Sequence, residues 1–236
     1  MLRIARRKTL ARLRREIEPV EQRVLGRLLT RWQGAAVPRA GLDALVDAIA
    51  ILQGTPLLAS ELEREILPAR VARYSPADLD ALLAAGEVVW LGMERLGDRD
   101  GRIALYLSSG LPSLLPPRQP ERVERSERAQ AILQMLEESG ASFFAAIHNA
   151  VGGGFPGDTL DALWELVWAG LVTNDTIHPL RGLLRPSGER QGRPTRDDGH
   201  PGSPDFLRRF RARTSAGAPA QGRWSLIANR GGAMTA

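Results

Sequence analysis

The chain has 236 residues, a net charge of +5 and no cysteine, with 43% hydrophobic and 25% charged residues. This composition is typical of a soluble globular protein with one large domain or two ordinary ones. The lack of cysteine excludes disulfides and thiolate zinc sites, and no apolar run approaches the ~18 residues that a membrane span needs. The three histidines are scattered, so we expect no metal site, and we expect a cytoplasmic protein without a membrane partner.

Basic charge is concentrated at the two ends of the sequence. Residues 1–15 hold seven basic residues and no acidic one, and residues 176–236 hold eleven basic and four acidic ones. The intervening residues 16–175 hold fourteen basic and twenty-three acidic residues, so the part with the strongest folding pattern is acidic. All basic residues but Lys8 are arginines, which indicates a GC-rich coding bias and weakens any inference from arginine number alone.

The N-terminal residues have the pattern of two helices. Residues 3–17 form a basic amphipathic pattern, and a second helix with an apolar face begins near Pro19 and continues to Trp32. Gly34 follows, so we predict a basic helical hairpin over residues 1–36. A transit peptide or membrane-surface helix is the alternative, but the continuation into a second helix argues against both.

Residues 37–116 show the element order of a winged helix. Ser75 is a good N-cap for its third helix, Pro76 suits the first helical position, and Gly86 ends the helix. The predicted elements are helices over 40–52, 59–66 and 76–85, followed by strands at 88–90 and 103–106.

The same order returns over residues 121–228, after a proline-rich break at 111–120. The predicted elements are helices over 126–139, 141–150 and 158–169, with strands at 171–173 and 223–228. Both third helices carry the sequence Leu-Asp-Ala-Leu, which supports a tandem repeat. The composition predicts a long flexible wing or linker over 186–221 and a disordered tail over 229–236.

The predicted fold class is therefore mainly α with small β-hairpins (α+β): tandem winged-helix modules preceded by a helical hairpin. Several stretches resemble the large helicase-related (Lhr) family in family order. They include Tyr74-Ser75-Pro76-Ala77-Asp78-Leu79, Gly86-Glu87-Val88-Val89-Trp90, Trp164-Glu165-Leu166-Val167-Trp168 and Gly222-Arg223-Trp224-Ser225-Leu226.

The resemblance implies a fragment from the C-terminal winged-helix extension of a superfamily-2, DEAD/DEAH-type, ATP-dependent helicase of DNA repair. ATP and Mg²⁺ would bind the motor domains of such a protein, so no cofactor is expected in this chain. The partners that it implies are DNA or RNA, the motor domains of the parent protein and further copies of the chain.

No stretch of this chain has the pattern of a nucleotide-binding loop. Such a loop needs glycines followed by Lys and Ser or Thr. Lys8-Thr9 has no glycine loop before it, and Gly152-Gly153-Gly154 has no lysine after it and predicts a turn. We therefore expect no ATP hydrolysis by this chain.

The two predicted third helices are acidic where a groove-reading winged helix is basic. They carry no basic residue, and their acidic residues are Asp78, Asp80, Asp158, Asp161 and Glu165. Phosphates would be repelled from these faces. We expect the two modules to act as scaffolding or protein contacts.

Nucleic-acid binding is instead predicted on two basic clusters. Aromatic Phe206 and Phe210 accompany the second cluster and favour stacking on single strands. The alternative is an ordinary solvated helix face or tail. The first cluster comprises Arg3, Arg6, Arg7, Lys8, Arg12, Arg14 and Arg15, and the second comprises Arg208, Arg209, Arg211 and Arg213.

Three functions remain open from the sequence. The first is a scaffold and accessory nucleic-acid-binding region of an Lhr-type helicase, and the second is an oligomerisation scaffold that binds only protein. The third is part of a winged-helix DNA glycosylase-like unit, for which Asp158, Asp161, Glu165 and Asp175 are the acids available. Helix capping and solvated helix faces explain these acids better, so we assign no catalytic residue.

Overall fold

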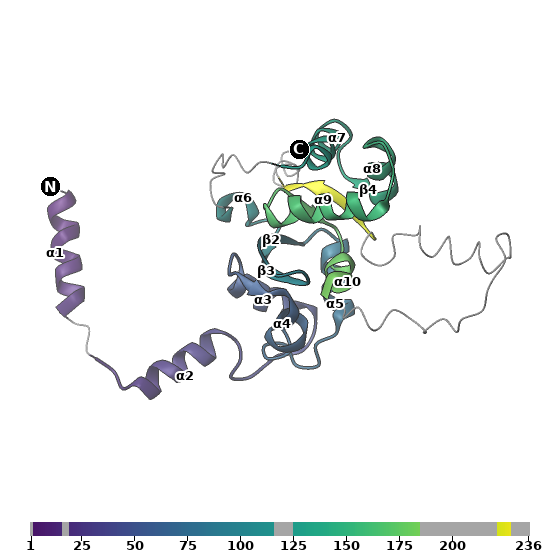
Figure 1. Ribbon diagram of the computed structural model, residues 1–236. Helices are drawn as coiled ribbons and strands as arrows, with labels where there is room; N and C mark the ends of the chain where they lie inside the picture. Colours follow the sequence, from purple (N-terminus) through teal and green to yellow (C-terminus); the bar gives the residue numbers. More distant parts are fainter. Residues whose placement is uncertain (1, 16–18, 116–124, 185–220, 228–236) are drawn as a thin grey trace.

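Two copies of one helix–strand arrangement form the body of the protein (Figure 1). The computed structural model describes residues 2–15, 19–115, 125–184 and 221–227. An N-terminal pair of helices precedes the body.

The first unit combines its helices with a three-stranded antiparallel sheet of order β1-β3-β2. Its third helix begins at the predicted cap, where Ser75 Oγ accepts a hydrogen bond from the Ala77 backbone N–H at 3.3 Å, and ends before Gly86, which has a φ of 73°. The elements are α3 (Leu42–Leu52), β1 (Leu57–Leu58), α4 (Ala59–Glu61), the π-helix η1 (Leu62–Ile66), α5 (Pro76–Ala84), β2 (Val88–Leu96), β3 (Asp100–Leu107) and the short α6 (Leu111–Leu114).

The second unit repeats this topology, with sheet order β4-β6-β5. In both units a two-residue strand pairs with the last strand of the unit, which therefore lies in the middle of the sheet. The elements are α7 (Glu127–Ser139), β4 (Ser142–Phe143), α8 (Phe144–Ala150), α9 (Pro156–Trp168), β5 (Val172–Asn174), α10 (His178–Leu184) and β6 (Arg223–Leu226). The predicted tandem winged-helix arrangement is confirmed.

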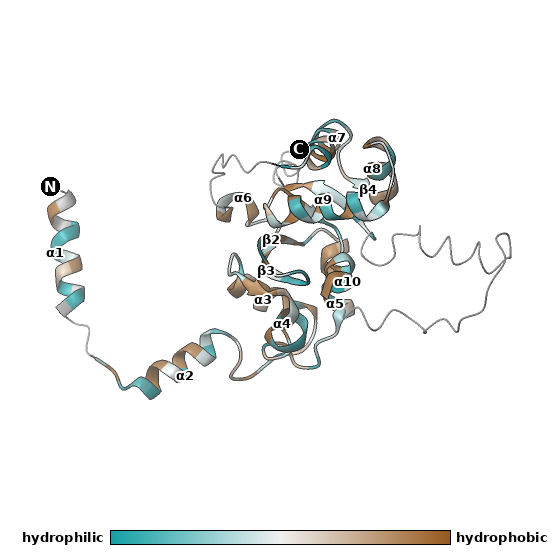
Figure 2. Ribbon diagram, viewed as in Figure 1, coloured by the Kyte–Doolittle hydropathy of each residue, from teal (hydrophilic) through white to brown (hydrophobic). Residues whose placement is uncertain are grey.

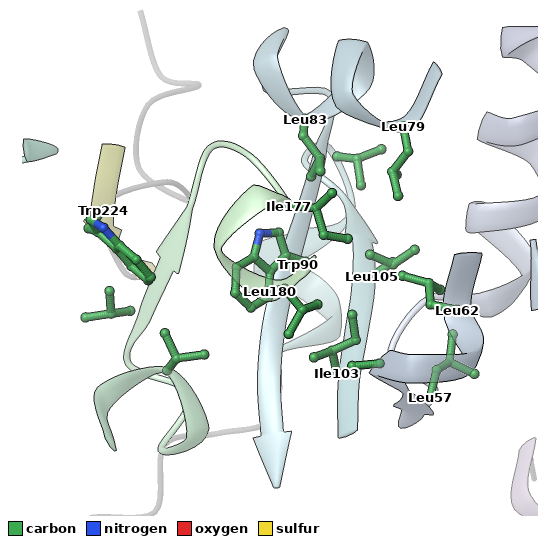
Figure 3. Packing of buried hydrophobic residues seen from close by; sticks show 14 of the residues in the cluster. Leu57, Leu62, Leu79, Leu83, Trp90, Ile103, Leu105, Ile177, Leu180 and Trp224 are labelled. Atoms are coloured by element: carbon green, nitrogen blue, oxygen red, sulfur yellow. The ribbon is translucent and has the colours of Figure 1, made fainter. Parts of the chain in front are cut away.

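Most of the buried apolar side chains of the two units form one shared cluster, and a smaller second cluster joins Ile227 to buried residues of β2, β3 and α6. Trp164 of α9 is the central contact, because its ring centroid lies 6.4 Å from that of Trp90 on β2 and 6.0 Å from that of Trp224 on β6. Figure 3 shows Ile177 and Leu180 of the second unit among the buried residues of the first. The units are therefore packed against each other as one body.

The predicted long helices and strands agree with the structure to within a few residues, with the differences at the short elements. Strands β1 and β4 and helices α6 and α10 were not predicted, and α6 lies inside the expected proline-rich break at 111–120. Elements of two to seven residues show too little periodicity for a sequence signal and form because tertiary contacts hold them. The predicted wing or linker over 186–221, apart from residue 221, and the tail over 229–236 lie outside the described residues.

The N-terminal helices α1 (Leu2–Arg15) and α2 (Gln22–Trp32) do not pack as the expected hairpin within the described residues (Figure 1). Ile4 and Leu10 of α1 and the apolar side chains of α2 are exposed. Both helices carry a strong excess of arginine, so like charges oppose their pairing, and each has only one apolar stripe to bury. In Figure 2 the ribbon of α2 alternates between hydrophobic and hydrophilic residues, as an amphipathic helix does.

Candidate nucleic-acid interface

The third helix of the first unit, α5, presents no group that could bind a phosphate or a base edge. A groove-reading winged helix needs basic or amide side chains at this place. Asp78 and Asp80 are half-buried, and the helix has no basic residue. The exposed residues of α5 are Pro76, Ala77, Ala81 and Ala84.

The second unit contacts α5 through Arg181 of α10. Its Nη1 donates to Asp80 Oδ2 at 2.9 Å, and its Nη2 donates to the Pro76 carbonyl oxygen at 3.3 Å. Two further bonds, from Nε at 2.6 Å and from Nη2 at 2.7 Å, reach the carboxylate of Glu63 on η1. The fold thus brings one arginine to α5, but two carboxylates neutralise it.

Tyr74 completes this polar group by donating its hydroxyl to Glu63 Oε1 at 2.7 Å. Burial, followed by this hydrogen bond, raises the pKa of Tyr74. Burial lowers the pKa of Arg181, but the bonds to Glu63 and Asp80 outweigh it and raise the pKa overall. Arg181 is therefore charged at neutral pH, and its bonds to Glu63 and Asp80 join the two units.

The third helix of the second unit, α9, packs with its C-terminal half on strand β2 of the first. A Cβ added to Gly92 would lie 2.4 Å from the Val167 carbonyl oxygen, and one added to Gly101 would lie 2.4 Å from the Trp168 ring. Along α9, the exposed residues before its C-cap are Asp158 and Asp161. The face that would meet a groove is therefore negative, as predicted.

Trp90 makes two hydrogen bonds across the same interface between the units. Its indole Nε1 donates to the Thr176 carbonyl oxygen at 3.0 Å, and its own carbonyl oxygen accepts from Thr173 Oγ1 at 2.5 Å. Trp90, Trp164 and Trp224 are buried and Trp168 is half-buried, so these side chains pack in the core and at its edge. None of the tryptophans in the body offers a free ring for stacking on bases.

The glycine turn before α9 is held by side chains that the sequence did not single out. Gly152, Gly153 and Gly154 all have positive φ, as the predicted turn requires. Arg128 donates to the Gly153 carbonyl oxygen at 3.0 Å and to Thr159 Oγ1 at 2.9 Å. His148 Nδ1 lies 2.8 Å from the same hydroxyl. These groups satisfy one another, which indicates a structural role.

The predicted basic clusters are only partly described. The first lies on α1, where the side chains of Arg6, Arg7, Lys8, Arg12 and Arg14 are exposed, and no acidic residue occurs along this helix. Arg3 and Arg15 also lie on α1, but their side chains are outside the described residues. The second cluster is outside them entirely: Arg208, Arg209, Arg211 and Arg213.

Comparison with known proteins assigns the first unit to a family. Residues 20–108 match the family model for the winged-helix domain of the large helicase-related protein. The chain belongs to the large helicase-related (Lhr) family. The predicted resemblance to an Lhr winged-helix region is confirmed, and the match includes α2 as well as the sheet of the first unit.

Two curated Lhr proteins are similar to most of this chain. It is 40% identical over 193 residues to the "Lhr helicase/ probable uracil glycosylase" of Mycolicibacterium smegmatis, covering 81% of this chain and 12% of that protein. It is 37% identical over 195 residues to the "Lhr helicase/uracil glycosylase" of Escherichia coli, covering 79% of this chain and 13% of that protein. The chain thus spans about an eighth of the length of these relatives.

Each of the four acidic residues considered for a glycosylase-like site is either exposed or hydrogen-bonded to a neighbouring element. Asp158 and Asp161 are exposed on α9. Glu165 accepts bonds from the Ser126 N–H at 3.0 Å and the Ser126 hydroxyl at 2.7 Å, which joins α9 to the start of α7. Asp175 accepts bonds from the Arg223 N–H at 2.7 Å and from Arg223 Nε at 2.8 Å. All four acids are thus either solvated or structural.

The described part of this Lhr region lacks a metal-binding cluster and a membrane-spanning helix. Within the described ranges, no group of three or more His, Asp or Glu residues could hold a metal ion. Among the same residues, no helix has the length and apolar content that crossing a membrane requires.

Proposed function

We propose that this chain is a scaffold and accessory nucleic-acid-binding region of an Lhr-type helicase that acts in DNA repair, without an ATPase of its own. The observation that carries the proposal is the contrast between α1 and the two third helices. On α1 the exposed charge is entirely basic, whereas α5 and α9 expose only neutral or acidic residues. A nucleic acid would therefore be attracted to the N-terminal helix and not to the groove-reading positions.

The preferred ligand is a single strand. The exposed residues of α5 are neutral, those of α9 before its C-cap are acidic, and the C-terminal half of α9 packs on β2, so neither helix offers a basic face to a duplex groove. α1 is about 20 Å long, enough for its basic side chains to follow several phosphates of an extended strand. The aromatic residues Phe206 and Phe210 beside the second arginine cluster support the same preference.

The scaffold role follows from the way in which the units are joined. The shared core, the Arg181 bonds and the close contact at Gly92 fix the two winged helices in one orientation. A rigid double unit can hold a bound strand at a fixed place relative to the motor domains of an Lhr protein. The ATP and Mg²⁺ for unwinding would bind those motor domains, and this chain alone would hydrolyse no ATP.

The test is binding of a fluorescently labelled single-stranded oligonucleotide, measured by anisotropy over a range of salt concentrations. Replacing Arg6, Arg7, Lys8 and Arg14 by Gln should weaken binding and reduce the salt slope by roughly 2–3, since each phosphate contact on a single strand contributes about 0.7. The matched control replaces four exposed arginines of the body by Gln: Arg64, Arg73, Arg95 and Arg102.

The control should leave the salt slope close to that of the parent chain, because these arginines lie away from α1. An equal loss in both variants would show that binding reflects general charge and would contradict the assignment to α1. No binding even at low salt would favour a protein-only scaffold.

A uracil glycosylase role is the second candidate, because the names of both curated relatives include that activity. The positions of Asp158, Asp161, Glu165 and Asp175 give no catalytic acid in the described part of this chain. We therefore expect uracil-containing DNA to remain uncleaved by alkali after incubation with this chain. Cleavage above that of a boiled control would establish the glycosylase instead.

A further inference from the structure

Helix α2 carries an apolar face that no described residue covers. Its large apolar side chains, together with Val20 before it, are between 46% and 67% exposed. Leu25, Leu28, Leu29 and Trp32 occur at positions i, i+3, i+4 and i+7. This spacing is the one by which an amphipathic helix binds in an apolar groove of a partner protein. A contiguous exposed apolar surface of this kind marks an interaction site.

The helix is attached to the first unit at its C-terminal end. Gln33, which follows α2, accepts a hydrogen bond from Arg70 Nη2 at 3.1 Å, and Arg70 Nη1 donates to the Ile66 carbonyl oxygen at 2.9 Å. A short parallel bridge between Arg39 and Val71 holds the segment after α2 against the body. α2 is therefore presented from the winged helix in a defined place and is not a detached tail.

Two observations favour another part of an Lhr protein as the partner that covers this face. The Lhr family match begins at residue 20, so α2 is part of the family's winged-helix domain, and the curated relatives are about eight times longer than this chain. Arg27 and Arg31 lie along one border of the apolar face, which favours a partner surface with carboxylates beside its apolar groove. Leucines and a tryptophan at this spacing do not suit a phosphate backbone, which separates α2 from the basic α1.

We propose that α2 docks with Leu25, Leu28, Leu29 and Trp32 in an apolar groove on the part of an Lhr protein that precedes this winged helix. Carboxylates at the edge of that groove pair with Arg27 and Arg31. The contact fixes the double winged-helix unit relative to the rest of the helicase. The proposal rests on the scaffold role proposed above and names its partner.

The test measures binding of the 236-residue chain to a purified segment of the Mycolicibacterium smegmatis relative, namely the part that precedes the residues aligned with this chain. Leu28→Glu places a carboxylate at the centre of the apolar face and should weaken binding by about ten-fold or more. Thr30→Glu is the matched control, because Thr30 lies on the opposite side of the same helix and both residues are exposed. It should change the affinity by less than about two-fold.

Unchanged affinity of Leu28→Glu, or no binding of the parent chain to this segment, would overturn the proposal. Two other occupants are tested directly by sedimentation of the chain alone and by flotation with anionic phospholipid vesicles. Self-association or vesicle binding that Leu28→Glu abolishes would also overturn it. Single-stranded DNA binding, measured on the same variants, should stay unchanged in both. A loss of single-stranded DNA binding would count against the assignment of that binding to α1 in the proposed function, and not against the contact of α2 with the rest of the helicase.

Discussion

Arg181 on α10 and Glu63 on η1 are joined by two parallel bonds of 2.6 and 2.7 Å, although 118 residues separate them in the sequence. Both side chains are only 21% exposed, and Asp80 on α5 binds the same guanidinium at 2.9 Å. One side chain of the second winged helix therefore holds two helices of the first. This contact neutralises Asp80 on the helix that a groove-reading winged helix would offer to DNA.

Replacing Arg181 by Met should destabilise the chain by roughly 2–4 kcal/mol, because Glu63 and Asp80 would remain partly buried without a counter-charge. The measurement is the free energy of unfolding from urea titration. Arg102→Met is the control, since the Arg102–Glu94 pair is about half exposed on both sides and should contribute less than about 1 kcal/mol. Equal losses in the two variants would show that Arg181 does not join the units.

Gly92→Ala should loosen the contact between β2 and α9. The added Cβ would lie 2.4 Å from the backbone oxygen of Val167, and a helix backbone cannot move aside as a flexible side chain can. Overpacking of this kind costs roughly 1–3 kcal/mol, which calorimetry would show as a lower midpoint of unfolding.

Gly26→Ala gives the matched comparison for this prediction. It lies in α2 with nothing within 4 Å of the new Cβ, so it should leave the unfolding of the body unchanged and favour the helix by up to about 1 kcal/mol. A Gly92→Ala variant as stable as the parent would mean that the two units are not in close contact there.

The sequence was sufficient for the two winged helices but not for the way in which they meet. The structure contains three features that local sequence signals predicted: the N-cap at Ser75, the end of the helix at Gly86 and the glycine turn before α9. Arg181 and Glu63 looked like ordinary charged residues, because their pairing depends on a docking geometry that no local pattern encodes. The contact of Trp164 with Trp90 joins the two modules in the same way, and no local pattern encodes it either.

The acidic third helices were predicted from composition, and their exposed residues have the expected character. The N-terminal pair shows where such reasoning fails. Two adjacent amphipathic helices suggest a hairpin, but the positive charge of both helices opposes their pairing. Burial of an apolar helix face also depends on a partner surface, which the sequence of a single helix does not reveal.

Both tyrosines of the chain should resist ionisation while the protein is folded. Burial, followed by the bond to Glu63, raises the pKa of Tyr74, and burial raises the pKa of Tyr106. In the unfolded chain a tyrosine ionises near pH 10, so the stabilisation from these groups is complete below about pH 10 and is lost as the pH rises above it. Tyrosinate absorbance in an alkaline titration should therefore appear together with unfolding.

Tyr74→Phe should make the free energy of unfolding less dependent on pH above about 10, because one of the two shifted groups is removed. A tyrosine that ionised near pH 10 in native protein, with circular dichroism unchanged, would contradict the burial of these side chains.

Deleting residues 2–15 should separate nucleic-acid binding from stability. None of the α1 side chains that the structure describes is buried, so the midpoint of thermal unfolding of the body should stay within about 1 °C of the parent chain. Affinity for single-stranded DNA should fall, because the deletion removes seven basic residues and no acidic one. If the shortened chain instead unfolded at a clearly lower temperature, α1 would belong to the folded body, and any loss of DNA binding could no longer be assigned to its charge alone.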